Sequence, residues 1–265
     1  MSQDFLFSLS ALIALLPAAA VGIRGNDGRD GLFWSTLAVA VAGPTVWTGV
    51  QILGTWQAGL SATLWATISV SMILFALIAI ATRQAWRLTA LMVPYLAILA
   101  TLALVLQQVP ARPLNEPVGI WLEAHIAASV ITYGLVTIAA VAALAALLQE
   151  RALKAKRPTA FTERLPSVAD CETLLVRLLV ASEAILALGL ATGMATLYRE
   201  RGTIIAFDHK TVLSMTAFVV IGGLLAAHFH SGTRGRTASR WVLLAYLLMT
   251  LGYPGVKFVT DVLMA

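Results

Sequence analysis

Long apolar runs fill most of this chain of 265 residues, and charged residues are confined to the short gaps between the runs. About 20 consecutive apolar residues are enough for a helix to cross the hydrocarbon core of a bilayer. Eight runs reach that length, at approximately 5–23, 31–53, 59–82, 88–107, 118–148, 171–198, 211–230 and 240–263. Backbone polar groups inside lipid must bond to one another, so each run is expected to be helical. The sequence therefore predicts one all-α domain over residues 1–265 with about eight transmembrane helices.

The composition excludes the ordinary soluble classes of protein. Only 12% of the residues are charged and 59% are hydrophobic, whereas soluble domains have about 25% charged residues. The formal net charge of +5 comes from Lys and Arg in short loops, which indicates contact with a bilayer and not with nucleic acid. The single cysteine, Cys171, excludes an internal disulfide. Motifs typical of soluble nucleotide-binding or hydrolytic enzymes are missing from the sequence.

The distribution of Lys and Arg predicts the orientation of the helices. The loops on one side carry twelve of these residues and those on the other side carry four. Because basic loops tend to remain in the cytoplasm, the richer side is predicted to be cytoplasmic and both termini to lie on the outer, periplasmic side. Residues 149–170 then form a basic cytoplasmic loop that can contact anionic lipid. At its end, Ser167 and Asp170 predict the N-cap of the sixth helix.

Of the four histidines, His125 has the position that most suggests a ligand. It follows Glu123 and lies seven residues into the fifth run, about 10 Å below the outer end at helical rise. Polar side chains at this depth are costly and are usually functional. A neutral imidazole is a good ligand for haem iron, but a histidine that only hydrogen-bonds to a neighbouring helix would fit the same position. The spacing leaves both interpretations open.

The other histidines lie at the ends of the seventh run. His209, beside Asp208, is at its outer end, where we favour contact with solvent or headgroups over a bis-imidazole site with His125. His228 and His230 close the same helix on the cytoplasmic side. About 27 Å of helical rise separates them from Lys210, so they cannot share an ion with His125.

Glu183 is predicted to lie near the middle of the bilayer in the sixth run. A carboxylate at this depth is costly unless it is protonated or paired, and Lys257 in the last run is a possible partner. A path for protons or cations remains an alternative. Breaks at Gly43-Pro44, Pro94 and 252–255 predict either packing kinks, which we favour, or the edge of a cavity.

Several short motifs, taken in order, resemble the CcsA-like cytochrome c assembly family over approximately residues 60–260. They are Glu123-Ala124-His125-Ile126, Leu165-Pro166-Ser167 followed by Glu172 and Arg177, Asp208-His209-Lys210-Thr211, His228 followed by Gly232-Thr233-Arg234-Gly235-Arg236, and Gly252-Tyr253-Pro254-Gly255-Val256-Lys257-Phe258. The resemblance is closest to short, eight-helix members. It implies a multi-pass protein of the bacterial inner membrane with haem as its cofactor.

The resemblance also implies roles for particular residues. His125 would be the outer histidine before the haem-handling loop and His228 the histidine deeper in the following helix, both as candidate iron ligands, with His209 and Asp208 beside that loop. Fuller family members have a loop rich in tryptophan that ends in Trp-Asp. Here residues 202–208 keep Asp208 but contain no tryptophan, so the outer haem platform looks reduced.

Three functions remain open at this point. The first is a haem-handling or haem-binding protein of cytochrome c-type biogenesis, at most a part of a haem delivery or lyase system. The second is a non-catalytic accessory subunit or regulator that binds other inner-membrane proteins without haem. The third is a transporter of small solutes or ions that uses Glu183.

Overall fold

The computed structural model describes residues 3–24, 28–53, 59–109, 119–204, 206 and 208–259, and all regular structure within them is helical. The elements are α1 (Gln3–Arg24), α2 (Gly31–Leu53), α3 (Leu60–Ala81), η1 (Ala85–Leu88), α4 (Thr89–Val105), η2 (Leu106–Gln108), α5 (Ile120–Lys154), α6 (Ala160–Arg164), α7 (Val168–Arg201), α8 (His209–Ser231), α9 (Gly235–Thr250), the π-helical η3 (Leu251–Gly255) and α10 (Val256–Phe258).

The predicted transmembrane class is confirmed in the part of the chain that the structure describes. Eight segments there are long and apolar enough to cross a membrane. Six of them are single helices, whereas the fourth joins η1, α4 and η2, and the eighth joins α9, η3 and α10. Their bounds follow the apolar runs closely because hydrophobic length determines where a chain can span. The end of the last predicted run, 260–263, lies outside the described residues.

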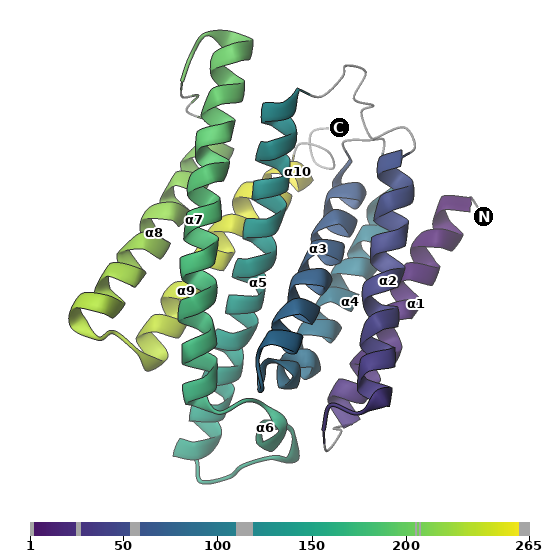
Figure 1. The fold of residues 1–265 in the computed structure, drawn as a ribbon, viewed down its shortest axis with the longest axis vertical. Helices are drawn as coiled ribbons and strands as arrows, with labels where there is room; N and C mark the ends of the chain where they lie inside the picture. The colour runs from purple at the N-terminus through teal and green to yellow at the C-terminus, as the bar shows by residue number, and fades with distance from the viewer. Residues whose placement is uncertain are drawn as a thin grey trace.

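Helix α5 lies at the centre of the bundle (Figure 1). Helices α1 to α4 lie on one side of it, α7 and α8 on the other, and it contacts α3, α7 and α9. Its middle turns are almost wholly buried and rich in alanine, including Ala139, Ala142, Ala143 and Ala145. Small side chains let neighbouring backbones approach closely in a membrane, where packing and not water exclusion drives helix association.

Hydrogen bonds made by side-chain hydroxyl groups connect helices across the interior. The Tyr133 hydroxyl of α5 bonds to the Tyr246 hydroxyl at 3.2 Å and to Thr250 Oγ1 at 3.1 Å, both on α9. Tyr95 of α4 also bonds to Tyr246 through its hydroxyl. Ser61 of α3 donates to the Ala103 carbonyl of α4 at 2.8 Å. Each bond satisfies a polar group that lipid could not satisfy, and so favours one arrangement of these helices.

The predicted basic loop at 149–170 is more ordered than expected. Residues 149–154 continue α5, α6 follows, and α7 begins at Val168. Gln149 holds this stretch together, since its Nε2 donates to the Thr162 carbonyl at 2.7 Å and to the Leu165 carbonyl at 3.2 Å. Polar composition alone does not reveal such a local anchor, and the cytoplasmic location of this segment stays a prediction.

The predicted start of the sixth span is confirmed. Ser167 is the N-cap of α7, and its hydroxyl accepts from the Asp170 backbone N–H at 3.2 Å. The same hydroxyl donates to Asp170 Oδ2 at 2.6 Å. The carboxylate therefore bonds to the cap side chain, whereas in the usual capping box the N3 side chain bonds to the cap backbone.

Arginines bind the C-terminal carbonyls of two helices at the same end of the bundle. Arg29 donates through Nη1 to the Ala79 carbonyl at 2.9 Å and to the Thr82 carbonyl at 3.2 Å, at the end of α3. Arg164 donates to the Ile23 carbonyl of α1 at 2.5 Å. Basic side chains are favourable there because the last carbonyls of a helix lack backbone partners.

Replacing Gly22 by alanine should destabilise the contact between α1 and α4. A Cβ at this position would lie 3.0 Å from the Ala90 nitrogen and 3.0 Å from the Thr89 carbonyl carbon, and backbone atoms cannot move aside cheaply. We expect a loss of about 1–3 kcal/mol, visible as a lower melting temperature of the helical circular dichroism signal in detergent. Gly49→Ala is the matched control, because no atom lies within 4 Å of its added Cβ. Equal melting of both variants would contradict this packing.

The predicted orientation can be tested with single cysteines in a Cys171→Ala background. Thr203 and Glu163 are both exposed, Thr203 beyond the end of α7 and Glu163 on α6 at the opposite end of the bundle (Figure 1). In intact cells, a membrane-impermeant maleimide should label Thr203→Cys and should label Glu163→Cys only after the cells are opened. The reverse pattern would place the termini in the cytoplasm.

Candidate functional site

His125 is held against α7 by a hydrogen bond to backbone. Its Nδ1 lies 2.8 Å from the Gly189 carbonyl oxygen. A carbonyl can only accept, so Nδ1 carries the proton and donates. The neutral ring then has its lone pair on Nε2, which is the arrangement that orients an imidazole as a metal ligand. A structural hydrogen bond and a role as metal ligand are thus compatible at His125, because the hydrogen bond uses Nδ1 and does not use Nε2.

Gly193 of α7 makes room for the imidazole. Gly189 and Gly193 form a Gly-x-x-x-Gly motif, a spacing that puts both glycines on one face of a helix and lets another helix approach. A Cβ on Gly193 would lie 2.9 Å from His125 Cε1 and 3.0 Å from Nδ1. The sequence reasoning missed this motif, although a scan for paired glycines in apolar runs would have found it.

The ring of His125 lies on the wall of a cavity of about 320 Å³, which is within the usual range for small-molecule sites. Its walls come from α3, α5, α7, α8, α9, η3 and α10. The lining residues are Ala62, Thr63, Ala66, His125, Ile126, Ser129, Val130, Thr132, Leu186, Gly189, Leu190, Ser214, Met249, Gly252, Tyr253 and Lys257. The cavity is therefore mostly apolar, with a few polar groups around the imidazole.

Three of the polar lining groups have properties suited to a ligand site. Ser129 lies one turn along α5 from His125, as predicted. The Thr132 hydroxyl is fully buried and has no hydrogen-bond partner among the described residues. Lys257, on α10, brings an ammonium group to the same cavity. An imidazole, a hydroxyl and a cation thus surround one apolar space.

A π-helical turn brings Tyr253 into this cavity. The break predicted at 252–255 is η3, and the Tyr253 ring packs 5.8 Å from the ring of Tyr133. Gly252 permits close approach to α8, because a Cβ there would lie 3.1 Å from Leu213 Cβ. Single π turns inside α-helices occur frequently at functional sites. Of the two interpretations of this break, the structure supports the edge of a cavity.

The structure places Glu183 and Lys257 in different surroundings. Glu183 faces α8, where a Cβ on Gly222 would lie 2.8 Å from its Oε1. Its Oε2 is buried and has no hydrogen-bond partner among the described residues. Lys257 lines the His125 cavity, which the Glu183 side chain does not. Their pairing stays a prediction.

The other predicted site residues lie at the two ends of α8. Asp208 is its N-cap and accepts from the Thr211 backbone N–H at 2.8 Å, and His209 is exposed beside it. At the other end, His228 Nδ1 lies 3.0 Å from the Thr233 carbonyl oxygen and donates to it. His228 and His125 are therefore not brought together.

Glu172, one of the motif residues, has a structural role that the sequence did not reveal. Its Oε1 accepts from the Gly235 backbone N–H at 2.7 Å, which ties the first residue of α9 to α7. Gly235 has a φ of +66° and Gly232 a φ of +67°, a conformation that glycine adopts at little cost. The basic turn between α8 and α9 is thus fixed by an acidic side chain.

The contact between His125 and Gly193 can be tested with a double mutant cycle. Gly193→Ala should lower the stability in detergent by about 1–3 kcal/mol, because the new methyl group collides with the imidazole. In a His125→Ala background the same change should cost little, since the ring is gone. Gly189→Ala is the control, because its Cβ would lie at an ordinary 3.5 Å from Ala128 Cβ. Equal costs in both backgrounds would contradict the contact.

Known proteins resemble this chain over different lengths. A protein of Azospirillum brasilense described as uncharacterised is 54% identical over all of both chains. The inner membrane protein YpjD of Escherichia coli K12 is 30% identical over 139 residues, which is 52% of each chain. No solved structure matches. The model of the family described as "Cytochrome C assembly protein" matches residues 45–264, a span that contains α3 to α10 and the His125 cavity. This chain is a multi-pass membrane protein that belongs to the cytochrome c assembly protein family.

Proposed function

We propose that this protein handles haem in the bacterial inner membrane during cytochrome c biogenesis, and that His125 would hold the haem iron. Family membership supports a role in cytochrome c biogenesis. The location is proposed from the eight apolar helices and from the description of YpjD as an inner membrane protein. The observation that carries the haem proposal is the hydrogen bond of His125, whose Nδ1 donates to the Gly189 carbonyl, so that in the neutral ring the lone pair is on Nε2.

The residues around His125 fit a haem group. Metal-binding histidines usually donate their second ring nitrogen to a carbonyl or carboxylate, which fixes the ring and increases its basicity. The apolar wall would cover the porphyrin, and the Lys257 ammonium could pair with a propionate. Haem, when bound, would supply an iron that can change its oxidation state. The chain itself orients the imidazole, surrounds the cavity mainly with apolar side chains and provides a cation.

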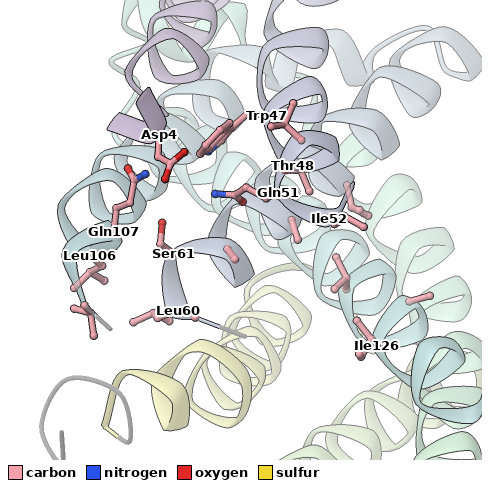
Figure 2. Close-up of a pocket in the computed structure, with 18 of the residues that line it drawn as sticks. Asp4, Trp47, Thr48, Gln51, Ile52, Leu60, Ser61, Leu106, Gln107 and Ile126 are labelled. Carbon is pink, nitrogen blue, oxygen red and sulfur yellow. The ribbon is translucent and has the colours of Figure 1, made fainter. Parts of the chain in front are cut away.

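A second cavity, lined partly by α2, adjoins the His125 cavity. It has a volume of about 630 Å³ and shares Ala62, Ala66, Ile126 and Val130 with the His125 cavity (Figure 2). These four side chains of α3 and α5 are small or apolar, so a large apolar ring would meet no charged group at the shared wall.

The test is the reduced-minus-oxidised visible spectrum of the protein purified in detergent. We expect haem bands that are lost in His125→Ala, because the ligand atom is removed. His230→Ala is the control, since His230 is exposed at the far end of α8. His228→Ala, which keeps the cavity intact, shows whether the second candidate histidine contributes. Cells that carry His125→Ala should also accumulate less covalently bound haem in their c-type cytochromes, as measured by haem staining of gels.

A colourless protein, even after haem is supplied, would contradict the proposal. In that case the accessory role without haem would be favoured, and partners should be sought by co-purification from the membrane. Bands that persist in His125→Ala but disappear in His228→Ala would place the ligand on α8, at His228, instead of on α5.

A further inference from the structure

The larger of the two cavities has polar groups that the proposed haem site does not use. It has a volume of about 630 Å³ and lies between α1, α2, α3, η2 and α5, near the end of the bundle where α5 begins. Its polar lining residues are Asp4, Trp47, Thr48, Gln51, Ser61, Gln107 and Glu123. Figure 2 shows Asp4, Gln51 and Gln107 turned toward the same space from α1, α2 and η2.

Three polar atoms in this cavity are buried without a partner. They are Trp47 Nε1, Gln51 Oε1 and Gln107 Oε1, and none has a hydrogen-bond partner among the described residues. Trp47 is 4% exposed, and its ring is fixed by stacking on Phe7 at 5.7 Å. Leaving a buried polar group unpaired is costly, so native proteins rarely do so. The two glutamine oxygens need a ligand with N–H or O–H donors, whereas the Trp47 N–H is itself a donor and needs an acceptor.

The charged residues of the cavity indicate which charge its ligand should carry. Asp4 and Glu123 bring two carboxylates, and no Lys or Arg is present among the described lining residues. The two glutamine oxygens are also acceptors. The His125 cavity has the opposite character, because Lys257 lines it and no acidic residue does among those described. A head group with several N–H donors and a positive charge fits the larger cavity, whereas a propionate or a free phosphate does not.

Apolar side chains form the remainder of the wall. Val70, Leu106, Ile126, Val130 and Ile131 line the space behind the polar groups. Asp4 and Glu123 are exposed, so they lie at the mouth and the apolar wall lies within. We propose that this cavity binds an amphipathic amine, whose ammonium group bonds to the Asp4 and Glu123 carboxylates and the glutamine oxygens while its apolar tail covers the inner wall.

Two sources could supply this chemistry, namely a lipid with an ethanolamine head group or a free long-chain amine. Native mass spectrometry of the full-length protein in detergent distinguishes them, with phosphatidylethanolamine, phosphatidylcholine and phosphatidylglycerol of equal acyl length, and dodecylamine, as probes. Phosphatidylcholine keeps the positive charge but has no N–H donor. We therefore expect about tenfold more bound phosphatidylethanolamine than phosphatidylcholine, the ratio that corresponds to one lost charge-assisted hydrogen bond. If the source is a free amine, dodecylamine binds and the lipids do not differ.

Variants connect the binding to the cavity. The double variant Asp4→Asn with Glu123→Gln should reduce amine binding about tenfold or more, because it removes both negative charges at the mouth of the cavity. Glu163→Gln, an exposed acid on α6 at the other end of the bundle, is the matched control and should change nothing. Equal binding of all probes, or amine binding that is unchanged in the double variant, would overturn the proposal. The haem spectrum should be the same in every variant, so this test is independent of the haem proposal.

Discussion

The close packing of α5 against α7 determines how the bundle is assembled. Lipid offers no hydrophobic drive for two apolar helices to associate, so contact distance and hydrogen bonds must supply it. Alanines of α5 and the pair Gly189 and Gly193 of α7 bring the two backbones together. Helix α5 also contacts α3 and α9. The packing of α5 against α7 therefore affects where the helices on both sides of α5 lie. The orientation of the His125 ring follows from this one contact.

The two cavities show how a small membrane protein can separate two kinds of chemistry. They meet at four small or apolar residues of α3 and α5, yet one carries an imidazole and an ammonium group and the other carries two carboxylates. In a medium of low dielectric constant, such a difference in charge strongly affects which ligand each cavity accepts. His125 and Glu123 are only two residues apart on α5. The turn of the helix is what directs them to different cavities.

The helices could be predicted from the sequence, but their lateral contacts could not. Apolar run length gave the eight spans, and Ser167 with Asp170 gave the start of α7. The cap at Asp208 was also readable, because aspartate is a preferred N-cap, but it was interpreted only as a site residue. The bonds of His125 to Gly189 and of Glu172 to Gly235 span 64 and 63 residues. Hydropathy contains no information on such pairings, because they depend on the rotational orientation of each helix about its own axis.

The binding of Arg29 and Arg164 to helix ends has a consequence for how the chain enters a membrane. Both residues belong to the basic loops from which the orientation was predicted, and both also satisfy terminal carbonyls of α3 and α1. The same guanidinium groups would thus have two roles. During insertion they favour keeping their loops in the cytoplasm, and in the folded protein they donate hydrogen bonds to helix ends. Moving these two arginines to the opposite loops in order to reverse the insertion would therefore also remove the hydrogen bonds at the ends of α3 and α1.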